Sequence, residues 1–131
     1  MTDKAPAAPD KEYLHSGSIT KAVLGWWKID LKTLAGRQRH QSISAARVLW
    51  GYLLRQRTLM SYQEIGRLMG NRDHSTAMYY VEKCRRDIGY NPAVRATLES
   101  VESLAEKIDQ ERKAQQLHGA TKTEQSGTPT R

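Results

Sequence analysis

The side chains best suited to recognising a ligand form one polar run near the middle of the sequence: Asp73, His74, Ser75 and Thr76. An aspartate can accept a hydrogen bond from cytosine, hydroxyl groups can donate or accept one, and a threonine methyl group can pack against thymine. A histidine can donate to a base or to a phosphate. At the start of an exposed helix, such a run is suited to reading the edges of DNA bases. For Asp73 the alternative is a simple helix cap, and the two roles are compatible.

Metal binding and catalysis have little support in the sequence. The histidines are scattered, at His15, His40, His74 and His118. No Cys/His or H-E-x-x-H spacing of a metal site occurs, and adjacent residues such as Asp73 and His74 splay apart on a helix. We therefore expect no enzyme activity, no metal and no cofactor. A lone cysteine, Cys84, excludes an intramolecular disulfide and fits a reducing cytoplasm.

A short helix is predicted before the polar run. Ser61 and Glu64 form a capping-box pattern, so this helix should begin at Tyr62. The pair Gly70-Asn71 tolerates the left-handed backbone conformation that commonly ends a helix. A tight turn is therefore expected directly before the polar run.

A longer helix is predicted to carry the polar run at its start. It should begin near Arg72-Asp73 and stop at Gly89. Apolar residues at four- and three-residue spacing predict its buried side: Ala77, Val81, Cys84 and Ile88. Short helix, tight turn and longer helix together predict a helix-turn-helix, whose second helix reads the major groove.

Basic residues are concentrated beside this motif. The net charge is +7, and residues 31–63 contain no acid but six basic side chains: Lys32, Arg37, Arg39, Arg47, Arg55 and Arg57. A basic stretch next to a groove-sized helix predicts a polyanion partner. The alternative is a merely soluble basic surface.

Three helices are predicted upstream of the motif. The first starts at about Ser18, which is a candidate cap, and the second spans Leu31–Leu34. Ser42 should cap the third, Ile43–Arg57, with Arg57 complementing its C-terminus. The buried stripe of the third helix should contain Ile43, Ala46, Leu49, Trp50, Leu53 and Leu54. Arg47 and Arg55 should point away from this stripe and suit DNA phosphate contacts.

Asn91-Pro92 predicts the start of a final helix that runs to about Leu117. The first turns should close the core, and the remainder should project alone or pair with a partner helix. The predicted fold is thus an all-α helical bundle over residues 18–117, with disordered tails at residues 1–12 and 118–131. No segment resembles a signal peptide or a membrane span.

The motif residues also resemble a known family. Ile65-Gly66, the run from Arg72 to Thr76 and Lys83-Cys84 resemble the signature of the C-terminal DNA-binding domain (domain IV) of the bacterial replication initiator DnaA. The similarity covers roughly residues 19–110 and includes Trp27-Lys28-Ile29, Leu34, Arg37, Arg39, Ser42-Ile43 and Arg47. It implies a Trp-repressor- or DnaA-like helical bundle that binds double-stranded DNA in a bacterial, phage or mobile-element setting, within the cytoplasm at the nucleoid.

The resemblance also implies roles for particular residues. Major-groove contacts are expected from Asp73, His74, Ser75, Thr76, Tyr62 and Gln63. Arg39, in the flexible segment between two predicted helices, is expected in the minor groove, where arginine is attracted to narrow A·T-rich stretches. Contacts to the DNA backbone are expected from Arg37, Arg47, Arg55 and Arg72.

Some positions depart from the DnaA pattern. DnaA commonly has a basic residue in place of Gln41, a glutamine in place of Val48 and a Leu-Pro pair in place of Tyr62-Gln63. These changes alter contacts with DNA, so the target need not be an unaltered DnaA box. No Walker-type phosphate loop occurs, so no nucleotide is expected and a stand-alone domain should not initiate replication by itself.

Two functions follow as hypotheses. The first is a sequence-specific double-stranded DNA-binding protein, acting as a transcriptional regulator or a replication accessory. The alternative is an interaction module whose C-terminal helix docks a second copy, or a replication or regulatory protein.

Overall fold

The structure, a computed structural model, describes the backbone of residues 11–125 and the side chains of residues 11–117. This part of the chain forms six helices and no strand: α1 (Ser16–Trp27), α2 (Leu31–Leu34), α3 (Gln41–Arg57), α4 (Tyr62–Leu68), α5 (His74–Tyr90) and α6 (Pro92–Gln125). The predicted all-α class is confirmed. Residues 1–10 and 126–131 lie outside the described part, so the disorder expected there stays a prediction.

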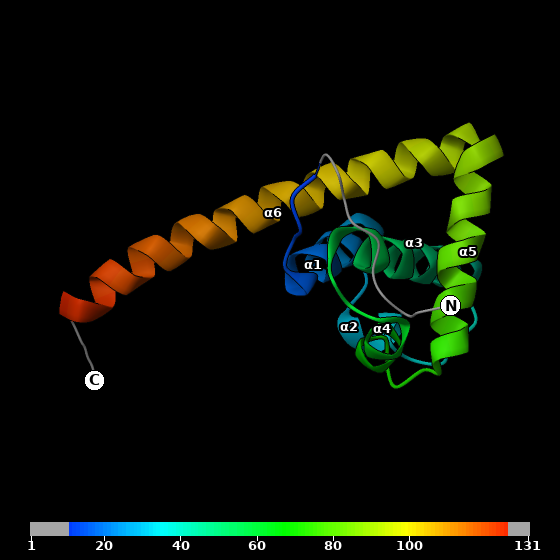
Figure 1. The fold of residues 1–131 in the computed structure, drawn as a ribbon, viewed down its shortest axis with the longest axis horizontal. Coiled ribbons are helices and arrows are strands. Elements are labelled where there is room, and N and C mark those ends of the chain that lie inside the picture. Colours follow the sequence, from blue (N-terminus) through cyan, green and yellow to red (C-terminus); the bar gives the residue numbers. More distant parts are fainter. Residues whose placement is uncertain (1–10, 126–131) are drawn as a thin grey trace.

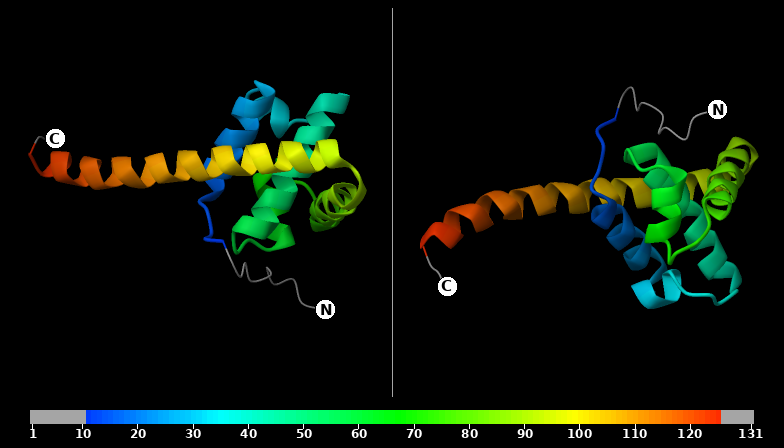
Figure 2. Two further views of the ribbon diagram at one scale, coloured as in Figure 1. Left: turned by 90° about the horizontal axis from the view of Figure 1, so that it is seen from above. Right: turned by 60° about the horizontal axis from the view of Figure 1, so that its bottom comes forward.

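The helices form a compact body from which α6 projects. Helices α1 and α3 pack against each other within the body, and α5 crosses one end of it (Figure 1). The first turns of α6 run over α1, and its later turns extend far beyond the body in every view (Figures 1 and 2). No helix within residues 11–125 is long and apolar enough to cross a membrane.

Aliphatic side chains and one tryptophan fill the core. Trp50 is completely buried, and its indole N–H donates to the hydroxyl of Thr20 at 3.0 Å. The predicted stripe of α3 is confirmed as buried. Side chains from the other main helices complete the core: Ile19, Val23, Ile65, Met69, Val81, Leu98 and Val101. Since the sequence has no Phe, Trp50 supplies the aromatic bulk at the centre.

Several helix boundaries were predicted correctly because local signals determine them. The Ser61–Glu64 capping box is present, and Asn91 accepts hydrogen bonds from the first N–H groups of α6. Gly70 and Asn71 both have positive φ, at 97° and 58°. The predicted turn of the helix-turn-helix is therefore confirmed.

Other boundaries were wrong. Ser42 does not cap α3, which already begins at Gln41 after His40. Gly89 does not stop α5, because the helix continues to Tyr90 before Asn91 breaks it. The backbone of α6 stays helical to Gln125, beyond the expected end near Leu117.

A buried carboxylate fastens α6 to α1. Asp109 is almost fully buried and accepts hydrogen bonds from the Ser18 hydroxyl at 2.9 Å and the His15 backbone N–H at 3.1 Å. The sequence suggested that Ser18 caps α1, but the serine lies inside the helix and its hydroxyl binds Asp109. Instead His15 caps the helix by accepting from the N–H of Gly17.

Arg57 fastens α6 to the end of α3. Its buried guanidinium donates to Glu102 at 2.6 Å and Glu106 at 2.9 Å, and to the backbone carbonyl of Glu12 at 3.0 Å. Arg57 lies in the last turn of α3, where a cation complements the helix C-terminus as expected, and its hydrogen-bond partners lie on α6 and the N-terminal segment. Lys11 and Glu12, assigned to the N-terminal tail, form ion pairs with Glu102 and Lys113 of α6, so these two residues pack against α6.

Candidate nucleic-acid interface

The start of α5 presents the polar run to solvent. The side chains of Asp73 and His74 are 67% and 60% exposed, Ser75 is exposed, and Thr76 is half-buried. Asp73 also caps the helix by accepting from the N–H of Ser75 at 3.1 Å. Hydrogen bonds from the Ser75 side chain and backbone hold the pKa of Asp73 below its ordinary value, so the carboxylate is ionised at neutral pH. Capping leaves this carboxylate accessible, so both readings of Asp73 fit.

The second turn of α5 continues the exposed face. Tyr79 and Tyr80 lie three and four residues after Thr76, and Lys83 lies seven residues after it, so the four share one side of the helix. Ala77, Val81 and Cys84 lie buried on the other side, as predicted. Burial also raises the pKa of the Cys84 thiol to about 12, so this cysteine is an inert part of the core.

A basic cavity of about 410 Å³ adjoins this face. It lies between α5, the start of α3 and the segment after α2, and is lined by Arg37, Arg39, Ser44, Arg47, Val48, Arg72, Tyr79, Tyr80 and Lys83. No acidic side chain lines it. We call the cavity lined by these residues the basic cavity. Positive charge gathered in a concave surface attracts anions such as phosphate groups.

The arginines predicted to contact DNA, Arg39 in the minor groove and the others at the backbone, differ in exposure. Arg37 and Arg39 are exposed. Arg47 is only 4% exposed, and Arg55 is also buried, so the expectation that these two side chains point away from the core is wrong. The guanidinium carbon of Arg55 lies 3.9 Å from the ring centroid of Tyr62. Tyr62, at the start of α4, was predicted to contact the major groove. Gln63, at the start of α4, is exposed.

The guanidinium groups of Arg47 and Arg72 face backbone carbonyls instead of solvent. Arg47 donates to Leu34, Gln38, Thr33 and Gly36 at 2.6–3.1 Å. The half-buried Arg72 donates to the carbonyls of Ala35, Gly36 and Met69. Burial, and then the neighbouring charge of Arg72, lowers the pKa of Arg47. Their placement does not support the phosphate contacts expected of them from the sequence.

Lys83 is a candidate site residue that the sequence analysis did not single out as a contact. Its ammonium group pairs with Asp87 at 3.4 Å and lines the basic cavity. The available signal was its position seven residues after Thr76, on the same face of the recognition helix.

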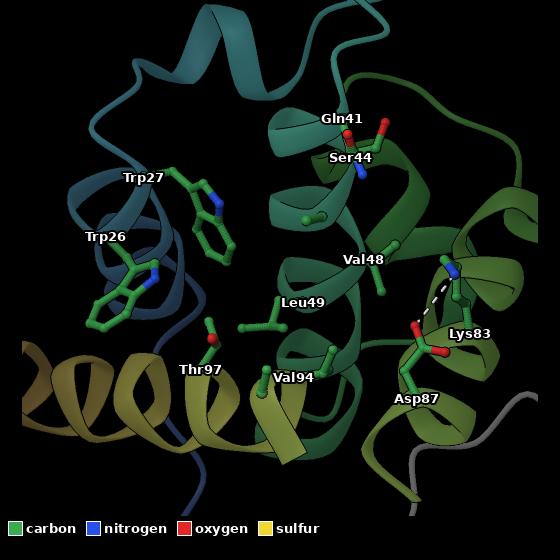
Figure 3. Close-up of a pocket in the computed structure, with 12 residues that line it drawn as sticks. Trp26, Trp27, Gln41, Ser44, Val48, Leu49, Lys83, Asp87, Val94 and Thr97 are labelled. Carbon is green, nitrogen blue, oxygen red and sulfur yellow. Dashed lines mark ion pairs between the residues drawn. The ribbon is translucent and has the colours of Figure 1, made fainter. Parts of the chain in front are cut away.

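A second, mainly apolar cavity lies between α1, α3, α5 and the start of α6. Its volume is about 520 Å³, and Trp26, Trp27, Leu49 and Val94 form much of its wall (Figure 3). The Lys83–Asp87 ion pair lies on the opposite side of the cavity in this view. Trp26 and Trp27 therefore line an apolar cavity and are not among the residues of the basic one.

Close backbone contacts fix the helix-turn-helix. The N–H of Arg72 donates to the carbonyl of Gly66 at 2.7 Å. A Cβ atom on Gly66 would lie 2.2 Å from the carbonyl oxygen of Arg72, and one on Gly70 would lie 2.2 Å from that of Ala35. Glycine at these positions lets α4 approach the turn and lets the turn approach the segment after α2.

Replacing Gly66 by alanine should therefore destabilise the motif. We expect the Gly66→Ala variant to lose about 2–3 kcal/mol of unfolding free energy, because the clash is with backbone. Gly89→Ala is the matched control, since a Cβ on this helical glycine meets nothing within 4 Å. It should gain about 0.5–1 kcal/mol from helix propensity. Urea denaturation measures both, and equal shifts would contradict the close approach at Gly66.

Comparison with known proteins gives a consistent picture. A family model described as the bacterial DnaA protein helix-turn-helix matches residues 17–84. The chromosomal replication initiator protein DnaA of Roseiflexus castenholzii is 36% identical over 84 residues, which cover 64% of this chain and 18% of that protein. DnaA of Magnetococcus marinus is 35% identical over 89 residues, covering 68% and 20%, and DnaA of Borreliella burgdorferi is 39% identical over 70 residues, covering 53% and 14%. The matched region therefore spans no more than about a fifth of each of these relatives.

Proposed function

Because the chain belongs to the family of bacterial DnaA helix-turn-helix domains, which are DNA-binding modules, we propose that it recognises particular sequences in double-stranded DNA. In this proposal it acts as a transcriptional regulator or as a replication accessory. The observation that carries the proposal is the exposed polar start of α5 directly beside a cavity lined by arginines and a lysine. The first can read bases and the second can hold phosphates.

Each part of the interface has a distinct role. Asp73, His74, Ser75 and Thr76 enter the major groove, where side chains near the start of a recognition helix reach base edges. Gln63 and Tyr62, at the start of α4, border the same groove.

The exposed arginines hold the strands. Arg39 enters the adjacent minor groove, whose negative potential is strongest where it is narrow. Arg37 and Lys83 contact backbone phosphates from the rim of the basic cavity. Such contacts supply affinity and orientation but no base recognition.

The alternative, docking of a partner helix on the end of α6, has weaker support. From Gln110 to Leu117 the side chains are exposed or half-buried, and only Ala114 and Leu117 are apolar. A helix pair needs an apolar stripe that recurs every three to four residues. This stretch does not carry one.

A salt titration tests the proposal. Binding to a duplex selected from a random pool should weaken with salt, and each phosphate neutralised should contribute a slope of about −0.9 in log K against log [salt]. Removing the phosphate contact of Arg37 and the minor-groove charge of Arg39 in the Arg37→Gln/Arg39→Gln variant should make the slope shallower by at least about 0.9. The matched control removes two exposed charges elsewhere, in Lys21→Gln/Lys107→Gln, and should change the slope little. Equal changes in the two variants would argue against an interface at the basic cavity.

A further inference from the structure

Two arginines bind backbone carbonyls at the end of α2 and in the segment that follows it. Together, Arg47 and Arg72 donate seven hydrogen bonds to carbonyl oxygens, and six of these bonds go to the five carbonyls of residues 33–36 and 38. Gly36 accepts from both, at 2.9 Å from Arg47 and 2.5 Å from Arg72. The two side chains come from separate parts of the chain, α3 and the turn before α5.

These hydrogen bonds solve a physical problem of the segment. The last carbonyls of a helix have no partners within it, and buried carbonyls without partners cost free energy. Residues 35–40, which we call the basic loop, contain no side chain that is buried in the core. A guanidinium group is a planar fork of donors, so one arginine can bind several carbonyls in a fixed arrangement.

The basic loop is also tied to the turn of the helix-turn-helix. Arg37 donates to the carbonyl of Gly70 at 3.2 Å, and Gly70 lies so close to Ala35 that a Cβ atom would collide with its carbonyl oxygen. The loop is thus fixed to α3 on one side and to the turn on the other. Arg37 and Arg39 remain exposed on it.

We propose that Arg47 and Arg72 are positioning residues that hold the basic loop in place, so that Arg37 and Arg39 are already arranged for DNA before binding. Arg47 and Arg72 act through the loop and do not themselves neutralise phosphates. This inference rests on the proposed DNA-binding function. Fixing the loop in advance removes the entropic cost of ordering it when the complex forms.

Charge-conserving variants distinguish positioning from direct contact. In Arg47→Lys and Arg72→Lys the charge stays, so a phosphate contact would largely survive, but a lysine ammonium cannot span the same carbonyls. We expect each variant to lower affinity for duplex DNA about tenfold. In the Arg37→Gln/Arg39→Gln background the same changes should cost less than about twofold, because the loop then has no contacts to position. Unchanged affinity, or equal losses in both backgrounds, would overturn the inference.

The order of the loop in the wild-type protein provides a test that does not depend on a variant. Backbone NMR order parameters of residues 35–40 in the free protein should be about 0.85, as in a rigid backbone. If the protein binds DNA but these order parameters are below about 0.6, the inference about Arg47 and Arg72 is overturned and the proposed DNA-binding function is not. If the wild-type protein does not bind duplex DNA, the proposed function fails, and the DNA role of the loop fails with it. Circular dichroism identifies any lysine variant that does not fold, and the order parameters then decide.

Discussion

Replacing Arg57 by alanine should lower the free energy of unfolding by about 3 kcal/mol. Arg57 is 3% exposed and donates to two carboxylates of α6, Glu102 at 2.6 Å and Glu106 at 2.9 Å. Without it, Glu102 keeps a largely buried negative charge with no buried cation beside it. The cost of leaving such a charge uncompensated is larger than the net stabilisation by the ion pair itself.

Lys11 provides the matched control for this prediction. Its ammonium group contacts the same carboxylate of Glu102 at 3.2 Å, but the side chain is 54% exposed. An exposed ion pair contributes at most about 1 kcal/mol, so Lys11→Ala should shift the urea midpoint much less than Arg57→Ala. Comparable losses would mean that the buried position of Arg57 is not what matters, and that α6 is held mainly by its apolar contacts.

The sequence predicts the helix-turn-helix well because its signals are local. A capping box is formed by residues three apart, such as Ser61 and Glu64, and a positive φ is tolerated by the residue type itself, as at Gly70. The polar run from Asp73 to Thr76 directly follows this turn, so its place at the start of α5 is also determined by neighbouring residues. These features therefore need no knowledge of which distant segments meet.

The roles of individual polar residues were less predictable because their partners are distant in the sequence. Ser18 lies at a plausible cap position, but it bonds Asp109, which is 91 residues away. Arg47 looks like a surface arginine on α3, yet its acceptors are carbonyls of the segment before the helix. A carbonyl is present at every residue, so no sequence pattern marks the ones that an arginine will bind.

The arginines of this domain consequently differ in role although they have the same charge. Arg57 pairs with carboxylates, Arg47 and Arg72 bind backbone carbonyls, and Arg37 and Arg39 remain exposed beside the recognition helix. The basic stretch indicated an anion partner, but only the fold shows which guanidinium groups are available to it. The interface that we propose therefore uses fewer of the basic residues than the sequence suggested.

The polar run should account for the choice of DNA sequence. We expect His74→Ala and Thr76→Ala each to weaken binding to a selected duplex by about 1–3 kcal/mol, the range for a good base contact. Binding to a scrambled duplex of the same length should change little, since nonspecific affinity comes from phosphate contacts. Arg37→Gln, in contrast, should weaken binding to both duplexes by a similar factor.

Thr76→Ser separates the two contacts available to this threonine. The variant keeps the hydroxyl group and removes the methyl group, so a full loss of preference would assign the base contact to packing against thymine. Retained preference would assign it to the hydroxyl hydrogen bond. Parallel titrations of the selected and scrambled duplexes measure all of these variants under one salt condition. If His74→Ala and Thr76→Ala weakened both duplexes equally, these side chains would be contributing affinity without reading bases, and the recognition role of the exposed start of α5 would have to be abandoned.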